Sequence, residues 1–452
     1  MTTLIKTDLD QPVQSRRELI DYLARGARPP ERWGIGVEME KLVIDPATGE
    51  AAPFVRIEAL LEAISAAGEW REVREGGRLL ALLGADSSIT LEPGGQLELS
   101  GKLCPDLFCC QGDFSRHVEQ IVTAGRSVGL AFLGLGVQPF TPLERIASIP
   151  KSRYGIMAPI MRRTGDMGER MMKQSAGLQV NLDYADEADC LAKLRLSLAM
   201  APLLYALFAN SPLLDGRPSG FLSTRGEIWS RTDPDRTGLL PELFRPGAGF
   251  ADYVEYALRV PMYFIFRDGH FIDCSGPPFP FGRYLEEGFG PYRATLADWD
   301  LHLSTLFPEA RLRPQIEVRC ADSLPPHLAL SFAALMKGLL YDRQALEHAW
   351  SLFSGLDAAA RDSLYRQSWR LGLKTPLGKR NLGQAAVEIL GAARLGLQRQ
   401  GRRNHRGLDE GVFLDELEEI AAGGVTLAER LLARWPESRP EQVALLLDHC
   451  GY

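Results

Sequence analysis

Short strands that follow one another too closely for intervening helices are the feature that most restricts the fold of this chain. The segment 78–101, "RLLALLGADSSITLEPGGQLELSG", contains two or three strands separated only by turns. Parallel strands need a crossover of a dozen or more residues, so strands spaced this closely pair antiparallel. Helical periodicity appears over 54–68 and 105–129, and it dominates from 325 onward. We therefore predict an α+β fold, with an antiparallel sheet and helices segregated to one side of it.

Composition excludes several kinds of partner. The 452 residues carry a net charge of −7 without a dense Lys/Arg stripe, so we expect neither nucleic acid nor membrane as a partner. No apolar run reaches the length of a membrane span, and the N-terminus lacks a signal-peptide core. The seven cysteines form no CxxC pair, which predicts reduced thiols and a cytoplasmic location. Since no repeat or linker divides the sequence, we predict one domain over 1–452, with a mainly helical portion from about 325 to 452.

Three strand patterns carry acidic, amide or guanidinium groups two residues apart. Because side chains alternate between the two faces of a sheet, residues at this spacing point to the same side. The pairs are Glu38 and Glu40 in "IGVEMEKLVID", Gln179 and Asn181 in "GLQVNLDY", and Glu317 and Arg319 in "PQIEVRCAD". Each face alone is consistent with exposure to solvent. The surrounding Ile, Val and Leu residues are typical of central strands, however, and favour polar faces that meet.

A fourth stretch, "ITLEPGGQLELSG", places Glu92 and Glu98 on either side of a Pro-Gly-Gly break. Apolar and polar residues alternate on both sides of this break, while Pro93 and the two glycines predict a turn or bulge that redirects the chain. A surface hairpin explains both glutamates without any function. The alternative is that the turn aims their carboxylates at those of the other strands.

If these faces converge, four or five carboxylates lie on one concave surface beside an arginine. Such carboxylates repel one another unless cations lie between them, which predicts two or more bound Mg²⁺ or Mn²⁺ ions. Mg²⁺ commonly bridges protein carboxylates to nucleotide phosphates, and arginine suits a transferring phosphoryl group. The sequence has no GxxxxGK[ST] loop and no kinase signature. The pattern therefore indicates an ATP-using enzyme whose sheet holds the metal ions.

Six ordered blocks resemble the plant-type glutamate–cysteine ligases, which also occur in many bacteria. They include "GVEMEKL", "SITLEPGGQLELSG", "GLQVNLDY", "STRGEIW" within a longer block, "YALRVPMYF" and "PQIEVRCAD", and the likeness runs from about residue 20 to the C-terminus. The resemblance implies a glutamine-synthetase-like fold, whose curved antiparallel sheet lines the active site. It also implies a monomer or homodimer that joins the γ-carboxylate of glutamate to cysteine, for glutathione biosynthesis, through an acyl phosphate made from ATP.

The same resemblance assigns roles to the polar residues. The implied metal-binding carboxylates are Glu38, Glu40, Glu92, Glu98 and Glu317. Gln179 and Asn181, together with Glu317, are implied near the nucleotide phosphates and metals. Arg319 is expected to steady the acyl phosphate beside Glu92, and both are our predicted catalytic residues. Arg225 and Trp229 resemble the family's amino-acid-binding loop, with core packing as the alternative for Trp229.

The departures from the family pattern concern its amino-acid site. The family typically reads "MMLRTCTVQVNLDF" where this chain has "MMKQSAGLQVNLDY", and "SMRSHIW" where it has "STRGEIW". An arginine is thus replaced by Gln174, a threonine by Gly177 and a histidine by Glu227, and we predict that all three contact the substrate. Two alternatives follow: a related ligase that uses another amino acid or amine in specialised metabolism, and a small-molecule phosphotransferase on the same fold.

Overall fold

One antiparallel sheet of nine strands forms the centre of the protein, for which the computed structural model describes residues 9–452. Eight strands follow the order β14-β15-β7-β1-β5-β4-β3-β2, and β6 pairs with β1. Every pairing within this sheet is antiparallel, as predicted from the close strand spacing. The strands are β1 (Ile35–Ile44), β2 (Arg71–Glu75), β3 (Arg78–Leu83), β4 (Ser88–Leu91), β5 (Leu97–Ser100), β6 (Ala131–Leu133), β7 (Gly177–Leu182), β14 (Ala310–Leu312) and β15 (Ile316–Asp322).

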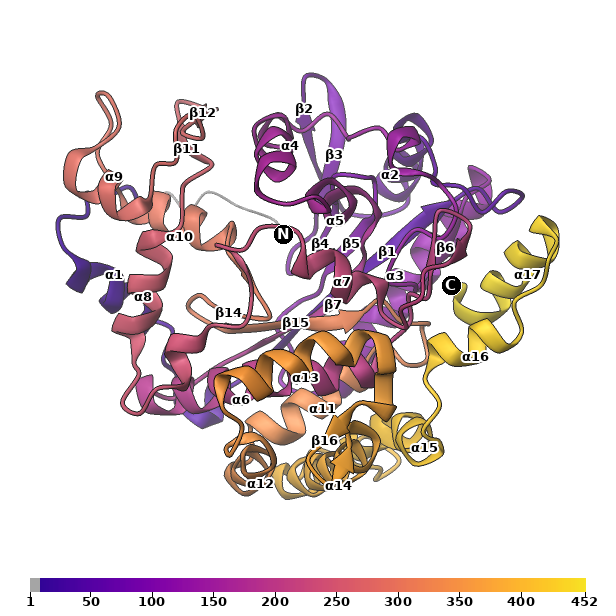
Figure 1. The fold of residues 1–452 in the computed structure, drawn as a ribbon. Helices are drawn as coiled ribbons and strands as arrows, with labels where there is room; N and C mark the ends of the chain where they lie inside the picture. The colour runs from indigo at the N-terminus through magenta and orange to yellow at the C-terminus, as the bar shows by residue number, and fades with distance from the viewer. Residues whose placement is uncertain (1–8) are drawn as a thin grey trace.

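The apolar face of the sheet is covered by helices from both halves of the chain. The covering helices are α2 (Phe54–Ala66), α3 (Leu107–Ser127), α6 (Glu187–Leu207) and α11 (Ser331–Leu340). Figure 1 shows β15 crossing the middle of the molecule, with α6 and most of the C-terminal helices below it and the last two helices to its right. The C-terminal helices are α12 (Arg343–Phe353), α13 (Ala358–Leu371), α14 (Leu382–Gln400), α15 (Asp415–Gly423), α16 (Leu427–Ala433) and α17 (Arg439–Cys450), which confirms the helical C-terminal portion.

Further helices border the polar face, so the prediction that helices are segregated to one side is wrong in this respect. They are α4 (Ser152–Thr164), α5 (Gly168–Gln174), α7 (Thr224–Ser230) and α10 (Leu296–Ser304). Several other elements lie to one side of the sheet in Figure 1: α1 (Arg16–Ala24), α8 (Phe250–Arg259), α9 (Phe281–Glu287) and the hairpin β11 (Phe264–Arg267) and β12 (His270–Asp273). With helices on both faces, residues of the polar face line a pocket between the sheet and these helices.

Helix α6 is the central core helix. Asp186 caps its N-terminus by accepting a hydrogen bond from the Asp189 backbone N–H. By length and composition α6 is apolar enough to cross a membrane, contrary to our expectation for the sequence, but 89% of its apolar window is buried within the protein. Burial against the sheet and the C-terminal helices explains its apolar composition.

The cysteines differ in one respect from the prediction of reduced thiols. Cys104 and Cys109 form a disulfide that joins the segment after β5 to the first turn of α3. The other five cysteines, including Cys110, are buried thiols. The prediction missed the pair because the chain folds back from β5 into α3, which brings two residues of unremarkable spacing together.

Candidate active site

Four neighbouring strands bring the predicted polar residues onto one face of the sheet. In the β1–β7 pairing Glu38 lies opposite Gln179, and in the β1–β5 pairing Glu40 lies opposite Glu98. In the β7–β15 pairing Asn181 lies opposite Glu317. Directly opposed residues on one face are close neighbours. The hypothesis that these faces converge is therefore confirmed.

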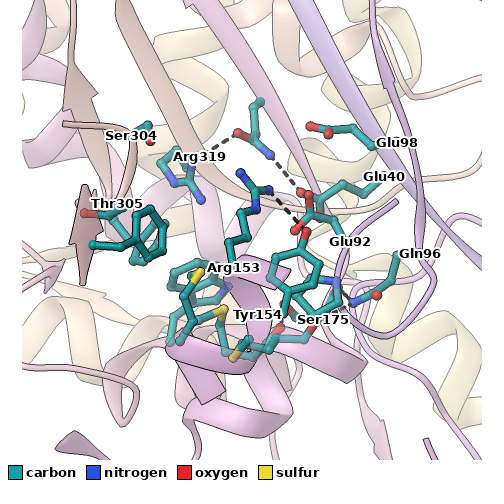
Figure 2. Close-up of a pocket in the computed structure, with 18 residues that line it drawn as sticks. Glu40, Glu92, Gln96, Glu98, Arg153, Tyr154, Ser175, Ser304, Thr305 and Arg319 are labelled. Carbon is teal, nitrogen blue, oxygen red and sulfur yellow. Dashed lines mark hydrogen bonds between the residues drawn. The ribbon is translucent and has the colours of Figure 1, made fainter. Parts of the chain in front are cut away.

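A pocket opens over this polar face. Figure 2 shows Glu40, Glu92 and Glu98 on one side of it and Arg319 with Thr305 on the other. Its volume is about 90 Å³, below the roughly 300–1,000 Å³ of typical small-molecule sites. A ligand of ordinary size therefore requires the bordering segments to move outward. The apolar part of its wall comprises Met157, Met171, Met172, Trp229, Phe264 and Phe307.

The Pro-Gly-Gly turn directs Glu92 into this pocket, and its shape requires glycine at two positions. A Cβ atom on Gly94 would lie 2.1 Å from the backbone oxygen of Lys173, at the end of α5. Gly95 has a φ of +89°, which favours glycine. Gln96 also stabilises the turn, since its side-chain amide donates a hydrogen bond to the backbone oxygen of Ser175 at 2.7 Å. The turn is thus docked on α5 and is not a free surface hairpin.

Arg319 links the carboxylates of β15 to the amide of β7. Its guanidinium donates to Gln179 Oε1 at 3.0 Å and to the carboxylate of Glu317. Gln179 in turn donates to Glu40 Oε1 at 2.8 Å. This chain of hydrogen bonds spans three strands, and it holds a permanent positive charge at the pocket wall.

Glu317 is already neutralised by two arginines. Arg311 donates to both of its carboxylate oxygens, at 2.8 and 2.6 Å, and Arg319 donates to Oε1. Burial opposes ionisation of this carboxyl, but Arg311 and Arg319 hold its pKa at about 2. Its predicted role as a metal ligand is not supported by this geometry, because its oxygens are engaged within the protein. Glu317 instead orients Arg319.

Glu38 and Glu40 are held in an unfavourable electrostatic environment. Burial and the neighbouring carboxylates of Glu317 and Glu98 raise the pKa of Glu38 to about 7. Burial, with Glu92 and Glu98, raises the pKa of Glu40 to about 8. Asn181 donates to Glu38 Oε1 at 3.0 Å, while the Gly177 N–H donates to Glu40 Oε2 at 2.6 Å. These few donors do not compensate the repulsion, so a cation would stabilise both ionised forms.

The residues fit Mg²⁺ only when a further ligand is supplied. Within residues 9–452, no three acidic, histidine or cysteine side chains lie close enough together to hold a metal ion by themselves. Two buried oxygens, Glu38 Oε2 and Asn181 Oδ1, nevertheless lack a hydrogen-bond partner in this part of the chain. Mg²⁺ is usually held by one or two carboxylates together with substrate phosphates. Glu38 and Glu40, together with Glu92 and Glu98, therefore suit ions that arrive with a nucleotide.

Arg225 and Gly177 contact each other beneath the pocket. A Cβ atom on Gly177 would lie 2.6 Å from Arg225 Nη2, so the guanidinium occupies the place of a side chain. Arg225 donates to the backbone oxygen of Arg319 at 3.0 Å, and its Nε and Nη1 have no partner among the described residues. Trp229 lines the pocket, and the guanidinium groups of Arg225 and Arg319 lie 5.5 and 5.4 Å from the centre of its ring. Of the predicted substrate residues, only Trp229 reaches the pocket surface.

Gln174 and Glu227 point away from the pocket. The Gln174 amide donates to the backbone oxygen of Thr141 at 2.9 Å and accepts from Arg170. Glu227 accepts from Arg231 at 3.1 Å, one turn further along the chain. Their predicted contact with substrate is not supported, because both side chains are occupied by neighbouring groups.

Residues that the sequence did not single out complete the pocket. Arg153 and Tyr154, in the first turn of α4, lie between the acidic wall and the methionines (Figure 2). Arg153 donates to the Tyr154 hydroxyl at 3.2 Å, and Lys151 donates to the backbone oxygen of Leu91 at 2.8 Å. The stretch "PKSRYG" resembles an ordinary basic helix start, which is normally solvated. Only its position opposite Glu92 gives it a place in the site.

An antiparallel sheet that carries carboxylates, amides and arginines on one face is the arrangement expected of a glutamine-synthetase-like carboxylate–amine ligase. The profile of a family described as glutamate-cysteine ligase family 2 (GCS2) matches residues 34–449. The glutamate–cysteine ligase of Brassica juncea is 40% identical over 422 residues, covering 92% of this chain and 80% of the relative. That of Medicago truncatula is 39% identical over 432 residues, covering 94% and 83%. This chain belongs to the glutamate–cysteine ligase family.

A solved structure supports the fold independently. The glutamate–cysteine ligase of Francisella tularensis in complex with AMP superposes with a TM-score of 0.54 at 13% identity, covering 92% of this chain and 88% of that one. The plant relatives are named as chloroplastic proteins, as is that of Arabidopsis thaliana at 40% identity over 92% of this chain and 79% of the relative. The predicted cytoplasmic location is wrong on this comparison, because charge and cysteine spacing carry no information about the organelle.

Proposed function

We propose that the protein joins glutamate, through its γ-carboxylate, to the amino group of cysteine, with ATP as the phosphoryl donor and Mg²⁺ as the cofactor. The observation that carries this proposal is the pocket in which Glu40, Glu92 and Glu98 face Arg153 and Arg319. A carboxylate is a poor electrophile, so an amide forms only after phosphorylation supplies a leaving group. The site has one wall for metal-bound phosphates and another for the anions that react.

Different residues of the pocket bind the metal ion and stabilise the negative charge that develops in the reaction. Glu40, Glu92 and Glu98 would hold Mg²⁺, which neutralises the approaching anions when it is bound. Arg319, fixed by Gln179 and Glu317, stabilises negative charge as the γ-carboxylate oxygen attacks the γ-phosphorus and ADP leaves.

The second half-reaction takes place against the apolar part of the pocket. The cysteine amine attacks the acyl carbon, inorganic phosphate departs, and the nitrogen loses a proton. Trp229, with Phe307 packed edge-on at 5.8 Å between ring centroids, excludes water that would otherwise hydrolyse the acyl phosphate. Amide formation depends on this exclusion as much as on the arginine.

The decisive experiment is Mg²⁺-dependent ADP release with glutamate and cysteine, with product masses recorded. We expect ADP, phosphate and γ-glutamylcysteine in equal amounts. Glu92→Gln should lower turnover by at least about 100-fold because it removes a charge from the metal wall, whereas Glu62→Gln, on the exposed surface of α2, should leave it unchanged. A phosphorylated product without amide would identify a phosphotransferase, and turnover only with another amine would identify a different ligase.

A further inference from the structure

A second and larger cavity lies on the opposite face of the sheet from the active site. Its volume is about 700 Å³, within the usual range for small-molecule sites. Helices α2 and α3 form two of its walls, and Leu99 of β5 lies at its floor. Glu98, the preceding residue, lines the catalytic pocket on the other face. The two spaces are therefore separated by the thickness of one strand.

Small residues and one indole give this cavity a flat wall. Trp70 lies against two glycines: a Cβ atom on Gly68 would be 2.9 Å from its Nε1, and one on Gly84 would be 3.1 Å from its Cζ3. Ala63 and Ala124, from α2 and α3, border the space without filling it. A flat aromatic surface facing small side chains accommodates a planar ring by stacking.

One polar group of the wall offers hydrogen bonds to such a ring. His117 is 4% exposed, and both of its ring nitrogens are buried and without a partner within residues 9–452, so they lie behind the cavity surface. Burial, with Lys41 nearby, lowers the pKa of His117 well below its usual value, so the imidazole is neutral, with one donor and one acceptor. The Gln120 amide lies one helical turn away on α3. The half-buried Gln120 side chain is therefore the group of this wall that can donate to and accept from a ligand.

Charge at the rim selects against anions. Glu69, Asp113 and Glu119 contribute three carboxylates, and Arg116 contributes the one cation. That cation is already paired with Asp113, at 3.4 Å. An anionic ligand such as a nucleotide or a free dicarboxylate would meet net negative charge. A neutral or cationic ligand would not.

We propose that this cavity binds a small planar heteroaromatic amine, neutral or singly cationic, at a site distinct from the catalytic pocket. The ring stacks on Trp70, and its exocyclic or ring nitrogens bond to the Gln120 amide. The binding needs neither ATP nor metal, so the proposal stands apart from the ligase function.

The test is calorimetric titration of the full-length protein with 2-aminobenzimidazole, without nucleotide or Mg²⁺. We expect saturable 1:1 binding. Gln120→Leu should weaken it about five- to tenfold through one lost hydrogen bond, and Ala63→Trp should abolish it by filling the space. Gln111→Leu, an exposed position on the same helix, is the matched control, and unchanged thermal melting shows that each variant is folded.

Two further outcomes bear on the chemistry. Benzimidazole-2-carboxylate, of similar shape but anionic, should bind at least about tenfold more weakly because it faces the rim carboxylates. The proposal is overturned if the wild-type protein does not bind the amine at millimolar concentration. It is equally overturned if Gln120→Leu and Ala63→Trp, both folded, bind as tightly as Gln111→Leu.

Discussion

Adding Mg²⁺ to the metal-free protein should release protons. Glu38 and Glu40 have pKa values of about 7 and 8 because they are buried beside other carboxylates. A bound cation favours their ionised forms, so metal binding must displace the protons that they hold. The number released then depends on pH in a way that the two pKa values determine.

At pH 7, Glu38 holds about half a proton and Glu40 about 0.9, so full ionisation of both releases about 1.4 protons. At pH 9 the release falls to about 0.1 because both carboxyls are already ionised. The apparent affinity for Mg²⁺ should therefore rise about 20-fold from pH 7 to its alkaline plateau. The sign is fixed, because raised carboxyl pKa values make metal binding weaker in acid and stronger in base.

Calorimetric titration of Mg²⁺ in buffers of different ionisation enthalpy, with a non-hydrolysable ATP analogue present, measures the protons directly. Glu40→Gln should reduce the release at pH 7 to about half a proton and the gain in affinity to about twofold. Glu62→Gln, with an exposed side chain, should behave as the wild-type protein. Proton release that is absent at pH 7, or that increases toward pH 9, would refute the view that uncompensated carboxylates form this wall.

Three other changes test separate parts of the structure. Gly94→Ala should destabilise the protein by about 1–3 kcal/mol and impair ADP release, since its Cβ would overlap the Lys173 carbonyl. Gly112→Ala, on α3 with open space around it, should change neither stability nor ADP release. Equal melting temperatures of the two variants would refute the predicted overlap. Cys104→Ser should lower the free energy of unfolding, measured by urea denaturation, by about 2 kcal/mol. Adding a reductant should then cause no further loss of stability. An unchanged denaturation midpoint would count against the disulfide. Arg319→Lys should lower the rate of ADP release at least about tenfold because lysine lacks the planar fork, and wild-type rates would exclude its role at the acyl phosphate.

The sheet and its polar face could be predicted because they depend on local periodicity. Alternation in β1, β7 and β15 places each polar pair on one side of its strand, and the turn-rich spacing makes the pairing antiparallel. Glu38 and Gln179 thus meet as neighbours without any further information. The family resemblance then supplies the chemistry.

The site residues outside the strands could not be predicted, because the direction of a side chain is not fixed by alternation once the chain leaves a regular strand. Gln174 ends a helix whose last turn faces Thr141, so its amide is used inside the protein. Glu227 lies one turn from Arg231 on a short helix, where a local ion pair forms. Arg153 reaches the site from a basic helix start, because α4 is positioned across the pocket from Glu92. None of these directions has a periodic signal in the sequence.

The pairing of Glu40 with Glu98 and of Asn181 with Glu317 also limits which mutations this chain can tolerate. An insertion or deletion of one residue in β1 would turn Glu38 and Glu40 into the apolar face and Met39 and Lys41 into the pocket. The same change in an exposed turn, such as Gly76-Gly77 between β2 and β3, leaves every register intact. Length variation should therefore be confined to the outer turns of the sheet, and the four central strands should vary only by substitution.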